Sequence, residues 1–255
     1  MKPGRYSLKA VVLSRTNYGE ADLIVGFLTR EQGKVSGLAK NARKSRKRFG
    51  AVLSSPALVE LTFAQTRGRD LVRLDKGESV RSFDNLSRDV FLLALAGQAM
   101  ELADAFCAPL DPVPEIFGLL LWCLARLEHG PRPEETMFIY QLRLLGLAGF
   151  APSLSVCPVC GRRPEPGKEF RLKPDLGGLV CRDCGPGGFP AGPGTIKLMA
   201  LIQGLGQDKI DRVRVTSQTR AEGGPFLMAL IRHTLGRDLK TARFLDQMAK
   251  KTKRG

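Results

Sequence analysis

Alternating apolar and polar residues dominate the first 80 positions of the chain. In Tyr6–Ser14, the residues Leu8, Ala10 and Val12 share one face at a period of two, which is the spacing of a half-buried β-strand. Further strands are predicted at Ala21–Thr29, Lys34–Lys40, Leu58–Gln65 and Leu71–Asp75, separated by turn signals such as Gln32-Gly33 and Arg67-Gly68-Arg69-Asp70. Five short strands in this length predict a small barrel or sandwich.

The apolar spacing becomes helical after Phe83. Helices are predicted at Val90–Phe106, with Ser87 as the N-cap, at Glu115–Glu128 and at Glu134–Leu147, and again at Thr195–Leu205 and Pro225–Lys250. Their broad apolar faces predict a helical bundle. The predicted domains are a barrel at 1–80, a first helical part at 81–150, a Cys-, Gly- and Pro-rich unit at 151–190, and a second helical part with a basic tail at 191–255. The fold class is therefore α+β and multidomain.

Four of the six cysteines form two CxxC pairs. Cys157 and Cys160 are followed by Cys181 and Cys184, and two such knuckles complete a tetrahedral shell of four sulfurs. The sequence predicts one structural zinc ion per chain, because four protein thiolates leave no coordination position for water or substrate. A redox CxxC pair or a metal-free knuckle is the alternative. The segment Phe170–Val180 between the pairs predicts a β-hairpin around Gly177-Gly178.

The net charge of +15, from 40 Lys and Arg against 25 Asp and Glu, points to a polyanionic partner. Nucleic acid and an anionic membrane surface are the candidates, and a basic surface can also serve solubility alone. No apolar run approaches the roughly 18–20 residues of a membrane span, and the first residues do not resemble a signal peptide. A cytoplasmic protein with no membrane partner is expected.

No acidic residue occurs between Gln32 and Val59, so the connection between two predicted strands is a basic loop suited to tracking a nucleic-acid backbone. A solvated loop with no partner is the alternative. The predicted nucleic-acid-binding residues are Lys34, Lys40, Arg43, Lys44, Arg46, Lys47 and Arg48, with Arg67, Arg69 and Arg73 near the second hairpin. Tyr6, Tyr18, Phe27, Phe49 and Phe63 are candidates for base stacking, although most strand aromatics belong to a core. The region from Phe226 onward is a second basic candidate.

Residues for catalysis are scarce. The two histidines, His129 and His233, sit at a helix end and on a basic helix, where capping or solvent exposure is expected. There is no GxxxxGK[ST] phosphate-binding loop and no clustered carboxylate motif for two-metal chemistry. No catalytic residue is assigned, and the chain is not expected to be an enzyme.

The order of these parts resembles the RecO family of bacterial recombination mediators over nearly the whole chain. The opening Arg15-Thr16-Asn17-Tyr18-Gly19-Glu20-Ala21-Asp22, then Leu28-Thr29-Arg30-Glu31-Gln32-Gly33-Lys34, is similar to that family, as are the Cys157–Cys184 knuckles. The resemblance implies an oligonucleotide-binding (OB) barrel at the N-terminus and an inserted zinc finger with four cysteine ligands. It also implies nucleoid association, binding of single- and double-stranded DNA, and annealing of complementary strands.

The resemblance further implies two protein partners. These are RecR and the acidic, apolar-ended tail of the single-strand-binding protein (SSB), which is displaced so that RecA can load. Leu227, Leu230, Ile231 and Leu235, with Arg232 and Arg237 nearby, are the candidate surface for that tail.

Two other classes of function remain open. The first is a zinc-ribbon transcription or translation factor that binds duplex DNA or RNA with sequence preference. The second is a basic assembly adaptor that meets an acidic protein and has no direct role with nucleic acid. Binding to bare oligonucleotides with a strong salt dependence separates the adaptor from the other two.

Overall fold

The computed structural model describes residues 1–45, 47–49, 52–53, 56–68, 71–165 and 170–252. The chain divides into two units, one formed by residues 1–131 together with 240–255 and the other by residues 132–239. The domain boundaries expected from the sequence remain a prediction. None of the described helices combines the length and hydrophobicity that crossing a membrane requires.

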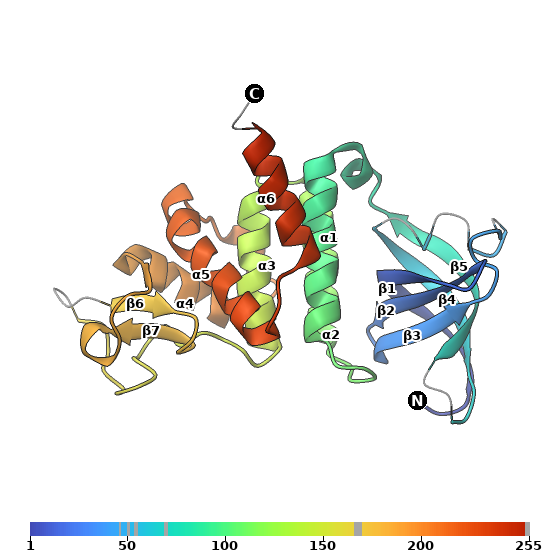
Figure 1. Ribbon diagram of the computed structural model, residues 1–255, viewed down its shortest axis with the longest axis horizontal. Coiled ribbons are helices and arrows are strands. Elements are labelled where there is room, and N and C mark those ends of the chain that lie inside the picture. Colours follow the sequence, from blue (N-terminus) through green and yellow to red (C-terminus); the bar gives the residue numbers. More distant parts are fainter. Residues whose placement is uncertain (46, 50–51, 54–55, 69–70, 166–169, 253–255) are drawn as a thin grey trace. The chain divides into compact units, whose positions relative to one another are not determined.

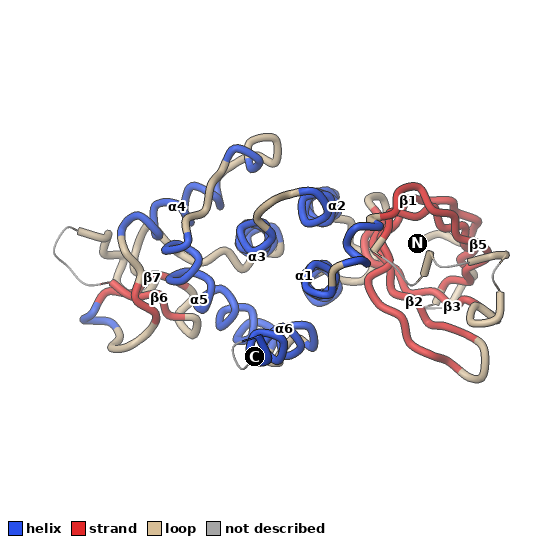
Figure 2. The backbone as a smooth tube through the Cα atoms, turned by 90° about the horizontal axis from the view of Figure 1, so that it is seen from above, coloured by secondary structure: helices blue, strands red, loops and turns tan. Residues whose placement is uncertain are grey.

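The first unit begins with a closed five-stranded barrel (Figure 1). Its strands are β1 (Gly4–Tyr18), β2 (Asp22–Thr29), β3 (Gly33–Ala39), β4 (Ala57–Gln65) and β5 (Val72–Ser82). They close in the order β1-β2-β3-β5-β4, with all pairs antiparallel except β3 and β5. Figure 2 shows the strands as a ring. A five-stranded barrel with this non-sequential closure is of the OB type, so the predicted fold class is confirmed.

Strand β1 buries residues on both of its faces. Ala10 and Val12 point into the barrel, where they join the core built around Phe27, Leu61 and Phe63. Val11 lies opposite Leu28 of β2 on the outer face, and both are buried, because α1 and α2 pack against these strands. A strand covered on two sides has a continuous apolar run rather than a clean alternation.

Three helices complete the first unit: α1 (Val90–Phe106), α2 (Pro114–His129) and α6 (Lys240–Thr252), with a short 3-10 turn, η1 (Asp84–Arg88), before α1. Helix α6 packs along α1. The carboxylate of Glu101 in α1 accepts hydrogen bonds from the backbone N–H groups of Lys240 and Thr241, both at 2.9 Å. A carboxylate at a helix start satisfies its free N–H groups and favours its dipole, so Glu101 fixes where α6 begins.

The second unit contains α3 (Pro133–Leu147), α4 (Pro193–Gly204) and α5 (Ser217–Leu235), with a 3-10 turn, η3 (Ile210–Arg212), between the last two. It also contains a small sheet in the order β7-β6-β8, built from β6 (Phe170–Lys173), β7 (Gly178–Cys181) and β8 (Phe189–Pro190), and the turn η2 (Arg182–Cys184). Gly223 of α5 allows close helix packing, because a Cβ there would lie 3.0 Å from both Met199 and Phe138.

The five strands and the hairpin at residues 170–181 follow the sequence prediction, whereas three details differ. The first strand, predicted at Tyr6–Ser14, continues to Tyr18, and the turn after it lies at residues 19–21, where Gly19 has a φ of 58°. The helix predicted as continuous over Pro225–Lys250 begins earlier, at Ser217, and ends at Leu235, because Gly236 adopts the left-handed conformation that terminates helices.

The N-cap of α1 is Asp89 rather than Ser87. The side chain of Asp89 accepts hydrogen bonds from the N–H groups of Phe91 and Leu92, at 2.7 and 3.1 Å. Ser87 lies within the preceding turn η1. Both residue types cap helices well, so the choice depends on where that turn ends.

Replacing the cap tests this assignment. The Asp89→Ala variant should unfold in urea with a free energy of unfolding about 1 kcal/mol below that of the parent, because two N–H groups lose their acceptor. The matched Ser87→Ala variant should be nearly neutral. Equal losses in the two variants would contradict the role of Asp89.

Candidate metal centre and candidate nucleic-acid interface

The four paired cysteines come together in the second unit. Cys157 and Cys160 lie on a turn that closes through a hydrogen bond from the Gly161 N–H to the Cys157 carbonyl, at 2.8 Å. Gly161 has a φ of 73°, a conformation that glycine adopts without strain. Cys181 ends β7 and Cys184 ends η2. Each knuckle therefore turns two sulfurs toward one point.

The sulfur geometry fits a single tetrahedral ion. All four Sγ atoms lie within 4.8 Å of one another, and the Sγ atoms of Cys160 and Cys181 are 3.7 Å apart. A tetrahedron of sulfurs about 2.3 Å from a central zinc has edges of about 3.8 Å. The cluster can therefore hold a metal ion with little rearrangement.

The electrostatics of the cluster also favour a cation. Burial of the Cys157 sulfur acts to raise its pKa, but backbone hydrogen bonds from Cys181, Cys160 and Val159 outweigh burial and lower the pKa to about 6. Hydrogen bonds with the neighbouring sulfurs of Cys160 and Cys181 raise the pKa of Cys184 to about 12. Without a cation, Cys184 therefore stays protonated at neutral pH.

The other two cysteines do not belong to this cluster. Burial raises the pKa of Cys107 to about 11 and raises that of Cys123 further. Both therefore stay protonated at neutral pH, and neither is a metal ligand.

The predicted basic loop follows β3 of the barrel, and the exposed cations among its described residues are Lys40, Arg43, Lys44 and Lys47. Arg43 is anchored to the first hairpin, since its guanidinium donates to the Glu20 carbonyl at 3.0 Å. Arg48 is half-buried and donates to the Ser45 hydroxyl at 3.2 Å. Two predicted residues, Arg46 and Arg69, lie outside the described residues.

Lys34 lies apart from this surface. Its ammonium donates to the backbone carbonyl of Asp104 at 2.5 Å and lies 3.4 Å from the carboxylate of that residue. The side chain therefore fastens β3 to α1. The cation that sequence reasoning grouped with the loop has a packing role here.

Two cavities lined partly by cations mark the barrel surface, and each joins residues that are distant in sequence. One, of about 620 Å³, is lined by Lys40, Thr66, Leu71 and Arg73 among others. The other, of about 570 Å³, is lined by Arg15, Asn17 and Arg43 among others. Sequence reasoning missed Arg15 and Asn17, although their two-residue spacing on an exposed strand end places them on one face.

Tyr18 is the one exposed aromatic side chain among the described barrel strands, with 56% of its surface accessible. Phe27, Phe49 and Phe63 are buried, and Tyr6 stacks on Phe63 with ring centroids 5.4 Å apart. Of the five aromatics considered from the sequence, Tyr18 alone presents a free ring face to solvent.

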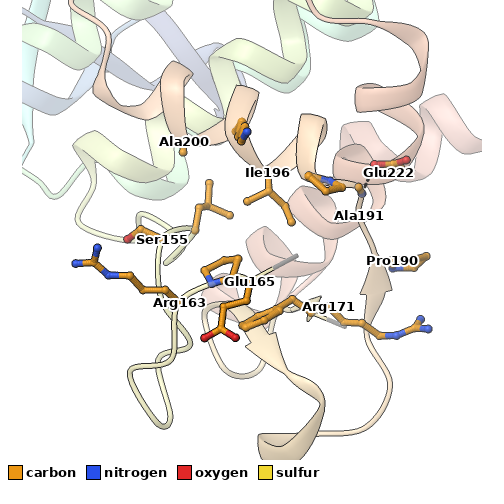
Figure 3. Close-up of a pocket in the computed structure, with 15 residues that line it drawn as sticks. Ser155, Arg163, Glu165, Arg171, Pro190, Ala191, Ile196, Ala200 and Glu222 are labelled. Carbon is orange, nitrogen blue, oxygen red and sulfur yellow. Dashed lines mark hydrogen bonds between the residues drawn. The ribbon is translucent and has the colours of Figure 1, made fainter. Parts of the chain in front are cut away.

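Figure 3 shows a larger apolar cavity of about 940 Å³ in the second unit. Ile196 and Ala200 of α4 line one side, and Leu154 and Phe170 contribute apolar walls. The charged side chains of Arg163, Glu165, Arg171 and Lys197 also line the cavity. Glu222 of α5 also lines the cavity, but its carboxylate accepts the Gly192 N–H at 2.8 Å, ahead of α4.

The apolar residues that the sequence placed in a surface notch of the C-terminal region are mostly core residues. Leu227, Leu230 and Ile231 of α5 are buried in the second unit, and Leu235 is half-buried. These residues therefore do not form an exposed notch beside Arg232 and Arg237.

Comparisons with known proteins cover nearly the whole chain. The family model described as "Recombination protein O N terminal" matches residues 1–83, and "Recombination protein O C terminal" matches residues 87–243. Proteins named DNA repair protein RecO are among the similar proteins. The one from Anaeromyxobacter sp. (strain K) is 35% identical over 247 residues, covering 96% of this chain and 97% of the relative. The one from Syntrophus aciditrophicus (strain SB) is 32% identical over 248 residues, covering 95% and 96%.

Proposed function

The chain belongs to the RecO family of DNA repair proteins, and from this membership we propose that it is a non-enzymatic recombination mediator that binds single- and double-stranded DNA. In this proposal it anneals complementary strands, acts with RecR, and displaces SSB so that RecA can load. The single observation that carries the DNA-binding part is the set of exposed cations on the loop after β3 of an OB-type barrel: Lys40, Arg43, Lys44 and Lys47.

The cations lie where OB folds commonly hold oligonucleotides. Such barrels bind through the β2–β3 face and the loops that follow β1 and β4. Here the loop after β1 follows Tyr18 and contacts Arg43 of the basic loop, while Lys40 and Arg73 share a cavity with Thr66 of the β4–β5 loop. These groups suit a phosphate backbone, because such contacts need positive charge but no base-specific geometry.

Tyr18 supplies the stacking surface in this proposal. Bases of single strands stack on aromatic side chains, whereas bases within a duplex are already stacked on one another. An exposed tyrosine beside a cationic loop therefore favours single-stranded over double-stranded DNA.

Replacing Tyr18 tests the proposed surface. In Tyr18→Ala, affinity for an oligo(dT) strand should fall by about 1–3 kcal/mol, the usual loss for one stacked base, while duplex affinity changes little. Tyr18→Phe keeps the ring and should bind like the parent. Fluorescence anisotropy at fixed salt measures all three proteins. If single-strand affinity is unchanged in Tyr18→Ala, the stacking site is not at this residue.

We propose that the metal held by Cys157, Cys160, Cys181 and Cys184 is one structural zinc ion. Zinc accepts four thiolates in a tetrahedral shell, and a full shell leaves no open position for catalysis. Bound zinc would stabilise all four sulfurs as thiolates. Its role is to order residues 151–190.

Metal analysis of two serine variants tests the zinc proposal. The parent should contain one zinc per chain, and Cys160→Ser should contain close to none, because three thiolates hold zinc less firmly than four. Cys107→Ser changes a thiol outside the cluster and should keep its zinc. Proteolysis of Cys160→Ser should cut first within residues 151–190 and leave the barrel intact. Zinc-free parent protein, prepared without chelators, would rule the proposal out.

The tail of SSB is the second protein partner in this proposal, and we place it in the apolar cavity of Figure 3. An acidic tail with apolar terminal residues needs an apolar hollow edged by positive charge, and the cavity offers Ile196 and Phe170 with Arg163 and Lys197. Glu222 also lines the cavity, but hydrogen bonds to its carboxylate reduce its repulsion of an acidic ligand. Its pKa is lowered by hydrogen bonds from the Thr195 and Gln218 side chains and from the Gly192 N–H.

Charge reversal tests this placement. The Arg163→Glu/Lys197→Glu variant should bind an SSB tail peptide at least about tenfold more weakly, equal to about 1.4 kcal/mol, because repulsion replaces attraction. The control Lys209→Glu/Arg212→Glu makes the same charge change at exposed positions of the same unit. Titration calorimetry compares the two. Equal weakening would mean that the peptide responds to net charge and not to this cavity.

A further inference from the structure

The strand β6 has two chemically different faces. Phe170 and Leu172 point to the apolar side and are buried, while Arg171 and Lys173 share the opposite face and are half-buried. Val180 of β7 lies opposite Arg171 in the register and is also buried. One face of the small sheet therefore holds the cations Arg171 and Lys173 beside the apolar Val180.

A cavity of about 350 Å³ lies over this face. It is lined by Arg171, Val180, Arg182, Gly185, Pro186 and Gly187, with no acidic side chain among them. Lys173 borders the same loop, because its ammonium donates to the Pro186 carbonyl at 3.2 Å. Two arginines therefore line this small cavity, and a lysine holds the loop beside it.

Glycines bring the loop backbone directly against the sheet. A Cβ at Gly185 would lie 2.9 Å from the Lys173 ammonium, and one at Gly188 would lie 2.8 Å from Lys173 Cγ. Gly187 and Gly188 have φ values of 77° and 101°, which glycine alone adopts readily. The wall opposite Arg171 is therefore bare backbone, and such glycine loops commonly accommodate anions.

Asp183, which directly follows Arg182 in the sequence, forms an ion pair with a residue outside the cavity. Its carboxylate accepts a hydrogen bond from the Arg162 guanidinium. Arg182 is exposed and lies between Cys181 and Cys184, so the second knuckle of the cysteine cluster fixes its backbone. The cysteine cluster therefore holds the backbone of one cation of the cavity in place.

We propose that this cavity binds a phosphate group of single-stranded nucleic acid and gives the chain a second strand-binding surface, separate from the barrel. Arginine guanidinium groups match phosphate oxygens in bidentate hydrogen bonds, and the hollow suits a phosphodiester group better than a stacked base. The inference rests on the proposed DNA-binding function and extends it. A chain that holds one strand on the barrel and another at the cysteine unit screens both backbones during annealing.

A matched pair of variants separates the two surfaces. Arg171→Gln/Arg182→Gln removes two charges at the cavity, and Lys209→Gln/Arg212→Gln removes two exposed charges elsewhere in the same unit. For the cavity variant we expect an affinity for a short oligo(dT) within about twofold of the parent, because the barrel is unchanged, and annealing of complementary strands at least about tenfold slower. The control should match the parent in both measurements. Annealing slowed equally in the two variants, or in neither, overturns the proposal.

A direct probe separates the cavity from the barrel function. Phenylglyoxal modifies accessible arginines, and inorganic pyrophosphate should protect Arg182 several-fold more than Arg212, as read by mass spectrometry of the zinc-loaded full chain. Equal modification of the two arginines overturns the site whatever the barrel does. Protection of Arg182 in a chain that binds no DNA supports the phosphate site and instead contradicts the proposed function.

Discussion

Closure of the barrel depends on a short parallel seam between β3 and β5. Gly37, Leu38 and Ala39 pair there with Val72, Arg73 and Leu74. A Cβ at position 37 would lie 2.9 Å from side-chain carbons of both Val72 and Leu74, so the strands approach this closely only where β3 lacks a side chain. The seam brings Lys40, just after β3, beside Arg73 of β5. The need for glycine at position 37 therefore helps to bring two cations, Lys40 and Arg73, together on the barrel surface.

Sequence patterns predicted the features that depend on local spacing. The period of two in the first 80 residues predicted five strands because one face of each must enter the barrel. The clustering of the four paired cysteines was predictable because each CxxC pair is a local turn. The exposure of aromatics was not predictable, since Phe63 and Tyr18 both lie in alternating strands and only strand pairing buries one and exposes the other. The packing role of Lys34 likewise depends on Asp104, which is distant in sequence.

The cysteine unit shows how a small segment gains stability without a large core. Leu172 and Leu179 are fully buried, but the hairpin that carries them is short, and metal binding supplies folding free energy to such units. A zinc ion held by four thiolates has a net charge of about −2. Arg162 lies beside the cluster, and the pKa of its guanidinium is raised chiefly by the Asp183 hydrogen bond and charge, with a contribution from Cys181. Arg162 thus offsets only part of that charge, because Asp183 is its main partner, whereas Arg182 lines a different cavity.

The return of the chain to its first unit at α6 has a consequence for biosynthesis. The surface of α1 that binds α6, including the carboxylate of Glu101, is present as soon as residues 1–131 have folded. Helix α6 itself is synthesised only after residues 132–239. Domains generally fold as they emerge, at about 5–20 residues per second. The barrel, α1 and α2 therefore remain attached to the ribosome for several seconds while the surface of α1 that binds α6 is exposed. During that interval α1 is accessible to chaperones, and a chain truncated within the second unit lacks α6, so that this surface of α1 stays uncovered.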